Sequence, residues 1–183
     1  RPLVKGEGKT SALSRDHVIH VDTSGLLTIT GGKWTTYRHM AEDCVDHAIT
    51  LGKLPDAECV TKNLRIHGYA ENSAALGSLE VYGSDAEKIR ALAAGEPTLA
   101  ARLHPALPYI AAEVVWAARE EMARTVEDAL ARHTRALFLN ANAAIAMAEP
   151  VARLLAAEQG RDEAWVAAQV KEFTELAQQY RVA

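Results

Sequence analysis

The 183-residue chain has only two cysteines, no excess of basic residues, and no apolar run long enough to span a membrane. Two cysteines do not make a disulfide framework. Twenty Lys and Arg against 24 Asp and Glu give a net charge of −4, which argues against binding to a phosphate backbone. Residues 1–10 also lack the apolar segment of a signal peptide. These absences predict a cytoplasmic protein with no nucleic-acid partner.

Two further motifs are missing. No Gly-x-Gly-x-x-Gly fingerprint follows a strand pattern, and the sequence begins at Arg1 without a methionine. We therefore expect the chain to be part of a longer protein. The seven histidines form no His-Glu-x-x-His pattern, and His17 and His20 fall on opposite faces of a predicted strand. No metal site is predicted.

The amino-terminal part of the sequence predicts a β-hairpin. Two runs rich in β-branched residues, Val18–Val21 and Leu26–Thr30, are separated by Asp22–Gly25. Short runs of this kind around a turn sequence that ends in glycine are typical of paired antiparallel strands.

From Tyr37 onward the apolar residues recur at steps of three and four, which is the spacing of a one-sided helix. Gly52 and Pro55 end this helix, since both residues disfavour its continuation. The apolar face consists of Tyr37, Met40, Ala41, Cys44, Val45, Ala48 and Ile49.

The remainder predicts one short strand, at Leu64–His67, followed only by helices. An apolar helix over residues 140–159 contains Pro150, which removes a backbone donor and should kink it. Gly160 ends that helix, and Asp162 caps the last one.

We therefore expect a mainly α chain of two domains. Residues 1–56 would be a small β-hairpin plus a helix, the remnant of a larger domain, and residues 57–183 would be an all-helical carboxyl-terminal domain. Apolar residues make up 49% of the chain, which is enough for a packed core.

Gly31, Gly32 and Lys33 stand where the strand pattern changes to the helix pattern. The first N–H groups of a helix have no partner inside it and, with the helix dipole, attract negative charge. With the Lys33 ammonium they would form a site for a phosphate, a carboxylate or an oxygen that becomes negative during a reaction. Glycines there would also let a planar ligand approach the main chain.

A simpler interpretation stays open. Gly31 and Gly32 would then form only a tight turn with positive φ, and Lys33 would be solvated. A Walker A loop is excluded, because that motif needs Gly at position 27 and Ser or Thr at 34, where Leu27 and Trp34 stand.

Two segments resemble a known family. The run SRDHVIHVDTSGLLTITGGKWTTYRHMAEDCVD, with Arg1-Pro2-Leu3 before it, resembles the carboxyl-terminal part of FAD-dependent glycerol-3-phosphate dehydrogenases. Farther along, REEMARTVEDALARHTRALFLNA, residues 119–141, resembles the helical domain that ends these enzymes. The two matches occur in the family's order and cover nearly the whole chain.

The resemblance implies that an amino-terminal FAD domain of the same polypeptide precedes Arg1. The turn at Gly31 and Gly32 would lie against the pyrimidine end of the flavin, where reduction leaves negative charge. Arg1 would bind the substrate phosphate, and Lys33 would act in substrate binding, flavin contact and catalysis. Thr35 and Thr36 would cap the helix and contact FAD.

The activity implied is oxidation of sn-glycerol 3-phosphate to dihydroxyacetone phosphate, with hydride transfer to FAD and electrons passed to a quinone. This chain alone would be colourless and inactive, because most FAD contacts lie upstream. One alternative is a non-catalytic helical module from about residue 57, used for homodimerisation or for peripheral attachment to the cytoplasmic face of the inner membrane. Another keeps the flavin but has an amine or amino-acid substrate, whose carboxylate Arg1 would bind.

Overall fold

A computed structural model describes residues 16–181. It confirms a mainly α chain with one β-hairpin. The chain forms two compact units, of which unit 1 ends at Ile66 and unit 2 begins at His67. We describe each unit by itself. The domain division after residue 56 stays a prediction, and the division between the units falls after Ile66, farther along the chain.

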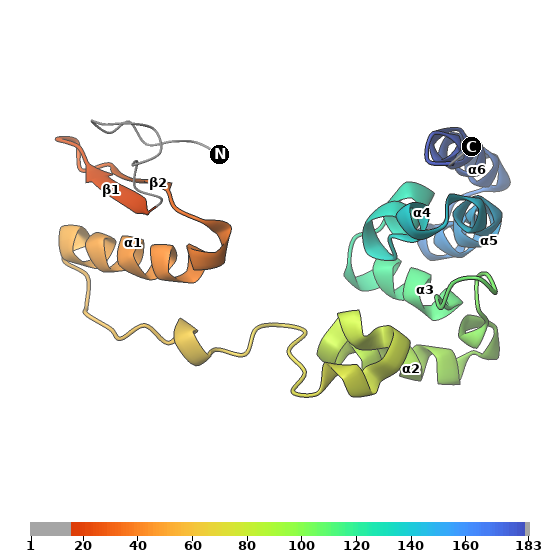
Figure 1. Cartoon of the computed structure of the whole chain (residues 1–183), viewed down its shortest axis with the longest axis horizontal. Helices are drawn as coiled ribbons and strands as arrows, with labels where there is room; N and C mark the ends of the chain where they lie inside the picture. Colours follow the sequence, from red (N-terminus) through yellow and green to blue (C-terminus); the bar gives the residue numbers. More distant parts are fainter. Residues whose placement is uncertain (1–15, 182–183) are drawn as a thin grey trace. The chain divides into compact units, whose positions relative to one another are not determined.

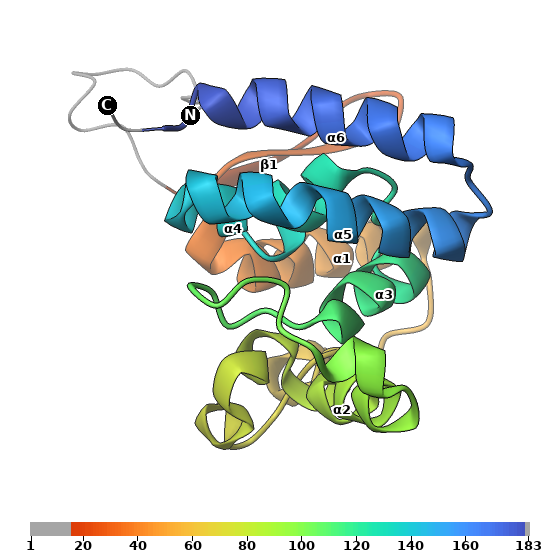
Figure 2. The ribbon, with the colours of Figure 1, turned by 90° about the vertical axis from the view of Figure 1, so that its right-hand side faces the viewer.

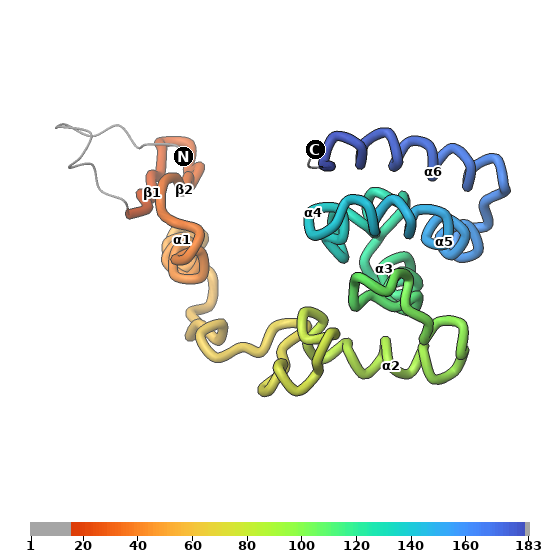
Figure 3. The backbone as a smooth tube through the Cα atoms, turned by 45° about the vertical axis from the view of Figure 1, so that its right-hand side comes forward, coloured from red at the N-terminus to blue at the C-terminus, as the bar shows by residue number. Residues whose placement is uncertain are grey.

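Unit 1 begins with the predicted hairpin. Strand β1 (His17–Val21) pairs antiparallel with β2 (Leu27–Gly31), and Ile19 lies opposite Ile29. The turn between them is closed by Asp22, whose Oδ1 accepts the backbone N–H of Ser24 at 2.6 Å. The hairpin follows one side of helix α1 in two views (Figures 1 and 3).

A single 3₁₀ turn, η2 (Trp34–Thr36), leads from β2 into helix α1 (Tyr37–Gly52). The helix has the predicted bounds. It ends because Lys53 adopts the left-handed conformation and returns its N–H to the carbonyls of the last turn. No residue of α1 is fully buried, so its apolar stripe is only partly covered within unit 1.

The predicted strand at Leu64–His67 is wrong. The chain forms a short 3₁₀ turn, η3 (Thr61–Asn63), and then continues without regular structure. Leu64 is extended, but within residues 16–181 no strand lies beside it to complete a ladder. Backbone extension alone therefore does not make a strand here.

Unit 2 is built from short and long helices joined by tight turns (Figure 2). Arg102 and Ile110 form an isolated antiparallel bridge between two of these turns. In order, its helices are η4 (Ser73–Asp85), α2 (Ala86–Gly95), η5 (Pro97–Ala100), α3 (Ala111–Glu120), the π-helix η6 (Asp128–His133), α4 (Ala136–Leu139), α5 (Ala141–Gln159) and α6 (Glu163–Gln178).

Helix α5 lies at the centre of unit 2, between α6 and α3. It continues through Pro150, which removes only one main-chain donor and lies on the exposed side. Gly160 ends α5 in the left-handed conformation, and Asp162 caps α6 by accepting the N–H of Trp165 at 2.9 Å. Both predicted helix ends are confirmed.

Two apolar clusters form the core of unit 2. The larger surrounds α5 and includes Leu130, Met147 and Leu155, none of which is exposed. The smaller joins η4, α2 and η5 to α3 through Ile89 and Val115. Leu103 and Leu154 pack against both clusters, so unit 2 has one continuous core.

Candidate functional site

The glycine turn, residues 31–33, connects β2 to the start of η2. Gly31 and Gly32 have φ of 84° and 73°, which glycine adopts without steric cost. Lys33 returns to an extended conformation, with φ −125° and ψ 149°, and the helical turns start directly after it. The structure therefore forms the strand-to-helix turn that the sequence predicts.

Gly32 is buried inside unit 1. Its N–H donates to the carbonyl of Asp16 at 3.1 Å, and a Cβ on it would lie only 2.3 Å from the Sδ of Met40. The absence of a side chain at Gly32 thus serves close packing against α1. This corrects the expectation that both glycines lie open to a planar ligand; that expectation remains only for Gly31.

The backbone N–H of Gly31, unlike that of Gly32, is not directed at the start of β1. In the antiparallel ladder it lies opposite His17, next to the hydrogen-bonded pair of Asp16 and Gly32. Because bonded and non-bonded pairs alternate, the N–H of Gly31 points away from β1. The amides of Trp34 and Thr35 also lack partners within the helical turns that they begin. The turn thus offers several main-chain donors close together.

The side chains predicted for the site have different positions. Lys33 is exposed at the turn, as is Thr35. Thr36 donates its hydroxyl to the carbonyl of Lys33 at 3.0 Å, and neither threonine accepts a capping hydrogen bond. The two threonines therefore do not cap the helix as predicted. Arg1 lies outside the described residues.

An exposed aromatic pair adjoins the turn. Trp34 and Tyr37 stack with ring centroids 5.6 Å apart and an interplanar angle of 27°. Their exposed fractions are 87% and 57%. Sequence reasoning missed this pair, although a tryptophan directly after Gly-Gly-Lys was visible. Exposed stacked rings beside a lysine provide a flat apolar surface next to positive charge.

His17 connects the start of β1 to α1. Its side chain is 7% exposed, and its Nε2 lies 2.7 Å from Oδ2 of Asp43. This hydrogen bond raises the pKa of His17 above its ordinary 6.5 and lowers the pKa of Asp43. The Nδ1 is 3.1 Å from Asp16 Oδ1 but makes no hydrogen bond. The ring also contacts His39 edge-on.

A hollow of about 570 Å³ lies elsewhere in unit 1, between α1 and residues 57–66. Apolar side chains dominate its walls, among them Val45 and Ile49 of α1. At its rim Arg38 donates to Glu42 at 2.7 Å.

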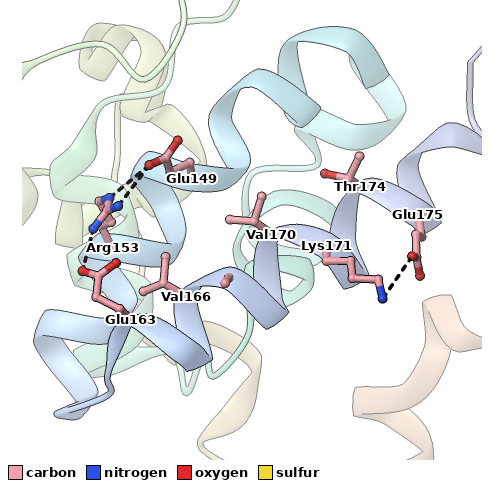
Figure 4. A pocket seen from close by; sticks show the side chains of 9 residues that line it. Glu149, Arg153, Glu163, Val166, Val170, Lys171, Thr174 and Glu175 are labelled. Atoms are coloured by element: carbon pink, nitrogen blue, oxygen red, sulfur yellow. Dashed lines mark hydrogen bonds and ion pairs between the residues drawn. The ribbon is translucent and has the colours of Figure 1, made fainter.

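A second hollow, of about 550 Å³, lies on unit 2 between α5 and α6 (Figure 4). Arg153 stands at one end and contacts Glu149 at 3.1 Å and Glu163 at 2.7 Å. Lys171 and Glu175 form a looser pair at the other end, with 3.9 Å between their charged atoms. Both cations that line the hollow are therefore paired, and its three carboxylates outnumber them by one.

Unit 2 also contains a buried carboxyl group. Glu113 is 2% exposed, accepts the N–H of Ile110 at 2.8 Å, and is hydrogen-bonded to the hydroxyl of Tyr82. Burial raises the pKa of Glu113 above its ordinary 4.5. Since this group closes the start of α3 beneath the surface, its role is structural.

Two features are absent from residues 16–181, the part of the chain that the structure describes. No group of three or more His, Cys, Asp or Glu side chains is arranged to hold a metal ion there. Over the same residues, none of the helices combines the length and the apolar character needed to cross a bilayer.

The geometry defines a strand, a glycine turn and an amide-lined helix start, followed by a helical unit with its own core. A family model described as the C-terminal domain of alpha-glycerophosphate oxidase matches residues 27–166. The match covers most of the chain, including the glycine turn and all of α5, so the chain belongs to this family. The family suggested by the sequence resemblance is confirmed.

Curated relatives agree with this assignment. The chain is 38% identical to a probable mitochondrial glycerol-3-phosphate dehydrogenase of Caenorhabditis elegans over 93% of its length. It is 36% identical to a mitochondrial glycerol-3-phosphate dehydrogenase of Arabidopsis thaliana over 84%, and 35% identical to that of Rattus norvegicus over 98%. It spans 27% to 29% of these relatives.

The relatives also correct one expectation. The composition favoured a cytoplasmic protein, with the cytoplasmic face of the inner membrane as its site of peripheral attachment. The relatives are instead named as mitochondrial proteins, and the cytoplasmic assignment is wrong. A low cysteine content and the lack of a signal sequence in residues 1–10 do not distinguish between these compartments.

Proposed function

We propose that this chain is the carboxyl-terminal part of a flavoenzyme that oxidises sn-glycerol 3-phosphate to dihydroxyacetone phosphate and passes the electrons to a quinone. The amino-terminal part of the same polypeptide would supply most of the FAD site. Support comes from the family match and from relatives named glycerol-3-phosphate dehydrogenase along most of the chain. The amide-lined helix start beside Lys33 is the single observation that carries the proposal.

The residues at this helix start fit a flavin. Bound FAD would supply the acceptor for the hydride, and negative charge would collect at one end of its ring system. The N–H groups of Gly31, Trp34 and Thr35, with the helix dipole, favour negative charge at that place. Gly31 has no Cβ to keep a planar group away from these donors.

Lys33 would have two tasks in the site. Its ammonium is exposed at the glycine turn, where it would bind the substrate and stabilise negative charge that develops during oxidation. Arg1 would bind the phosphate through its planar fork of donors. Thr35 and Thr36 would contact the cofactor, through the exposed hydroxyl of Thr35 and the main chain of the turn. Trp34 and Tyr37 would add an apolar wall.

The test compares this chain with the complete polypeptide. The 183-residue chain alone should bind no stoichiometric FAD and should not reduce an acceptor, whereas the complete protein should show flavin bleaching by sn-glycerol 3-phosphate. Lys33→Ala should lower the rate of bleaching by roughly a hundredfold or more. Lys62→Ala, which removes an exposed lysine of unit 1 outside the turn, should leave it unchanged. Equal bleaching by both variants would refute the role of Lys33.

A second function has its own support, because every buried apolar side chain among the described residues belongs to unit 2. Residues 67–183 can therefore be expected to fold alone and to act as an interaction module, for homodimerisation or peripheral membrane contact. Expression of this segment tests the idea. A folded segment that sediments as a dimer, or that floats with lipid vesicles, would support it. A folded monomer that does not bind vesicles would contradict it.

A further inference from the structure

We propose that His17, held by Asp43, is a positioning residue that fixes the glycine turn for the flavin. The proposal rests on the proposed function for the identity of the ligand. His17 lies opposite Gly31 in the ladder, and it would act through the geometry that it imposes on the turn. Three observations in unit 1 support this role.

The first observation is that the turn is tied to the start of β1. The N–H of Gly32 donates to the carbonyl of Asp16 at 3.1 Å. Asp16 immediately precedes His17, so any movement at the start of the strand moves the turn as well. The ideal Cβ position on Gly32 lies 3.4 Å from the Cβ of His17, which places the histidine directly against the turn.

The second observation is that His17 ties the same point to α1. Its Nε2 and the Oδ2 of Asp43 are 2.7 Å apart, although 26 residues separate them in sequence. A short bond between an imidazole and a carboxylate is charge-assisted and directional. The start of β1 therefore connects both to the turn, through the main chain of Asp16, and to the helix, through the side chain of His17.

The third observation is that no buried apolar core holds these parts of residues 16–66 together. Helix α1 contains no fully buried residue, and among residues 16–66 no apolar side chain belongs to the buried core. Where apolar burial is small, a polar tie contributes a larger share of local stability. The orientation of the donors at Gly31 and Trp34 would then depend on the bond between His17 and Asp43.

This tie should respond to pH. Below its ordinary pKa of 6.5, His17 is an imidazolium and binds Asp43 as an ion pair; the raised pKa means that this contribution is lost as pH rises through the folded value. Asp16 lies at the other ring nitrogen and His39 contacts the ring edge-on. Asp43 also contacts His47, with 3.3 Å between Nδ1 and Oδ1.

The first experiment uses the 183-residue chain and measures hydrogen exchange at the Gly32 amide. His17→Ala and Asp43→Ala should each speed exchange at least about fivefold, the factor expected for the loss of one hydrogen bond. His17→Gln keeps a donor and should restore most of the protection. Matched controls are His20→Ala and Asp46→Asn, which change exposed groups on the same strand and the same helix and should have no effect.

The second experiment uses the complete FAD-loaded protein. His17→Ala should lower the rate of flavin reduction at saturating sn-glycerol 3-phosphate about tenfold and shift the flavin potential, with little change in KM. His17→Gln should recover the rate but lose its decline at alkaline pH, because glutamine does not titrate. His20→Ala should resemble the unchanged protein.

The outcomes separate the two proposals. A complete protein that binds no FAD would refute the proposed function, while the exchange at Gly32 would still test the tie. Rapid exchange of the Gly32 amide in the unchanged chain, or the same protection in His17→Ala, would show that the bond between His17 and Asp43 does not hold the turn in place. A faster exchange combined with an unchanged potential and reduction rate would overturn the positioning role, since His17 would then be only structural.

Discussion

The two units of this chain are stabilised in different ways. Every buried apolar side chain in residues 16–181 belongs to unit 2, whereas unit 1 relies on hydrogen bonds and partly covered side chains. Large apolar residues of unit 1, including Val45 and Leu54, remain exposed. A unit that buries its own core can fold alone, but one that leaves its apolar stripe open needs additional atoms to cover it. The candidate site lies in the less self-sufficient unit.

Core truncation should show the largest contrast between the units. Leu155→Ala removes a side chain with no exposure from the centre of unit 2 and should lower its free energy of unfolding by about 3 kcal/mol, because the cavity cannot fully collapse. Val45→Ala, at a residue that is 56% exposed in unit 1, should cost no more than about 0.5 kcal/mol. Denaturation of each variant, followed by tryptophan fluorescence, measures both. Similar losses would contradict the proposed contrast.

One backbone substitution should destabilise unit 1 more than unit 2, which is the opposite of the effect of Leu155→Ala. Gly32→Ala places a Cβ against Met40 and forces alanine into φ of 73°, which should cost unit 1 about 1–3 kcal/mol. Unit 2 should be unaffected. The measurement is hydrogen exchange along β1, β2 and α1.

Two variants separate the causes of that loss. Gly25→Ala has a similar φ of 86° but nothing within 4 Å of the new Cβ, so it reports the backbone cost alone, about 1 kcal/mol. Adding Met40→Ala to Gly32→Ala should recover the part due to crowding. If the double variant recovers nothing, the conformation of Gly32, and not its packing, is the requirement.

How much could be predicted differs between the units as well. Local patterns predicted the hairpin, helix α1, the left-handed end at Gly160 and the cap at Asp162, because each depends on residues adjacent in sequence. The patterns also predicted a strand at residues 64–67, which failed because a strand needs a partner that no local pattern supplies. The turn at Gly31, Gly32 and Lys33 was predicted as well, and the role of these residues in binding stays a prediction. The packing of Met40 against Gly32 and the tie from His17 to Asp43 were missed, since both join residues distant in sequence.

The smallest expected effect concerns pH, and it sharpens the comparison because each unit contains a poorly exposed side chain whose pKa is raised, Glu113 in unit 2 and His17 in unit 1. Burial raises the pKa of Glu113 in unit 2, so the folded state retains a proton that the unfolded state loses. The stability of unit 2 should therefore fall as pH rises from about 4.5 through the folded pKa. In unit 1 the corresponding loss should begin only above about 6.5, because it follows His17.

Glu113→Gln should remove the fall in the stability of unit 2 that begins at about pH 4.5. Glutamine keeps an acceptor for the N–H of Ile110 but has no proton to lose, so unit 2 should gain up to about 1 kcal/mol at neutral pH. In this variant the stability of unit 1 should still decline as pH rises above about 6.5. His17→Gln should flatten that decline and leave the pH dependence of unit 2 unchanged. Residue-resolved hydrogen exchange between pH 4 and 8 distinguishes the two units. If one substitution flattened both profiles, the units would share a single titration, and their separate stabilisation would have to be abandoned.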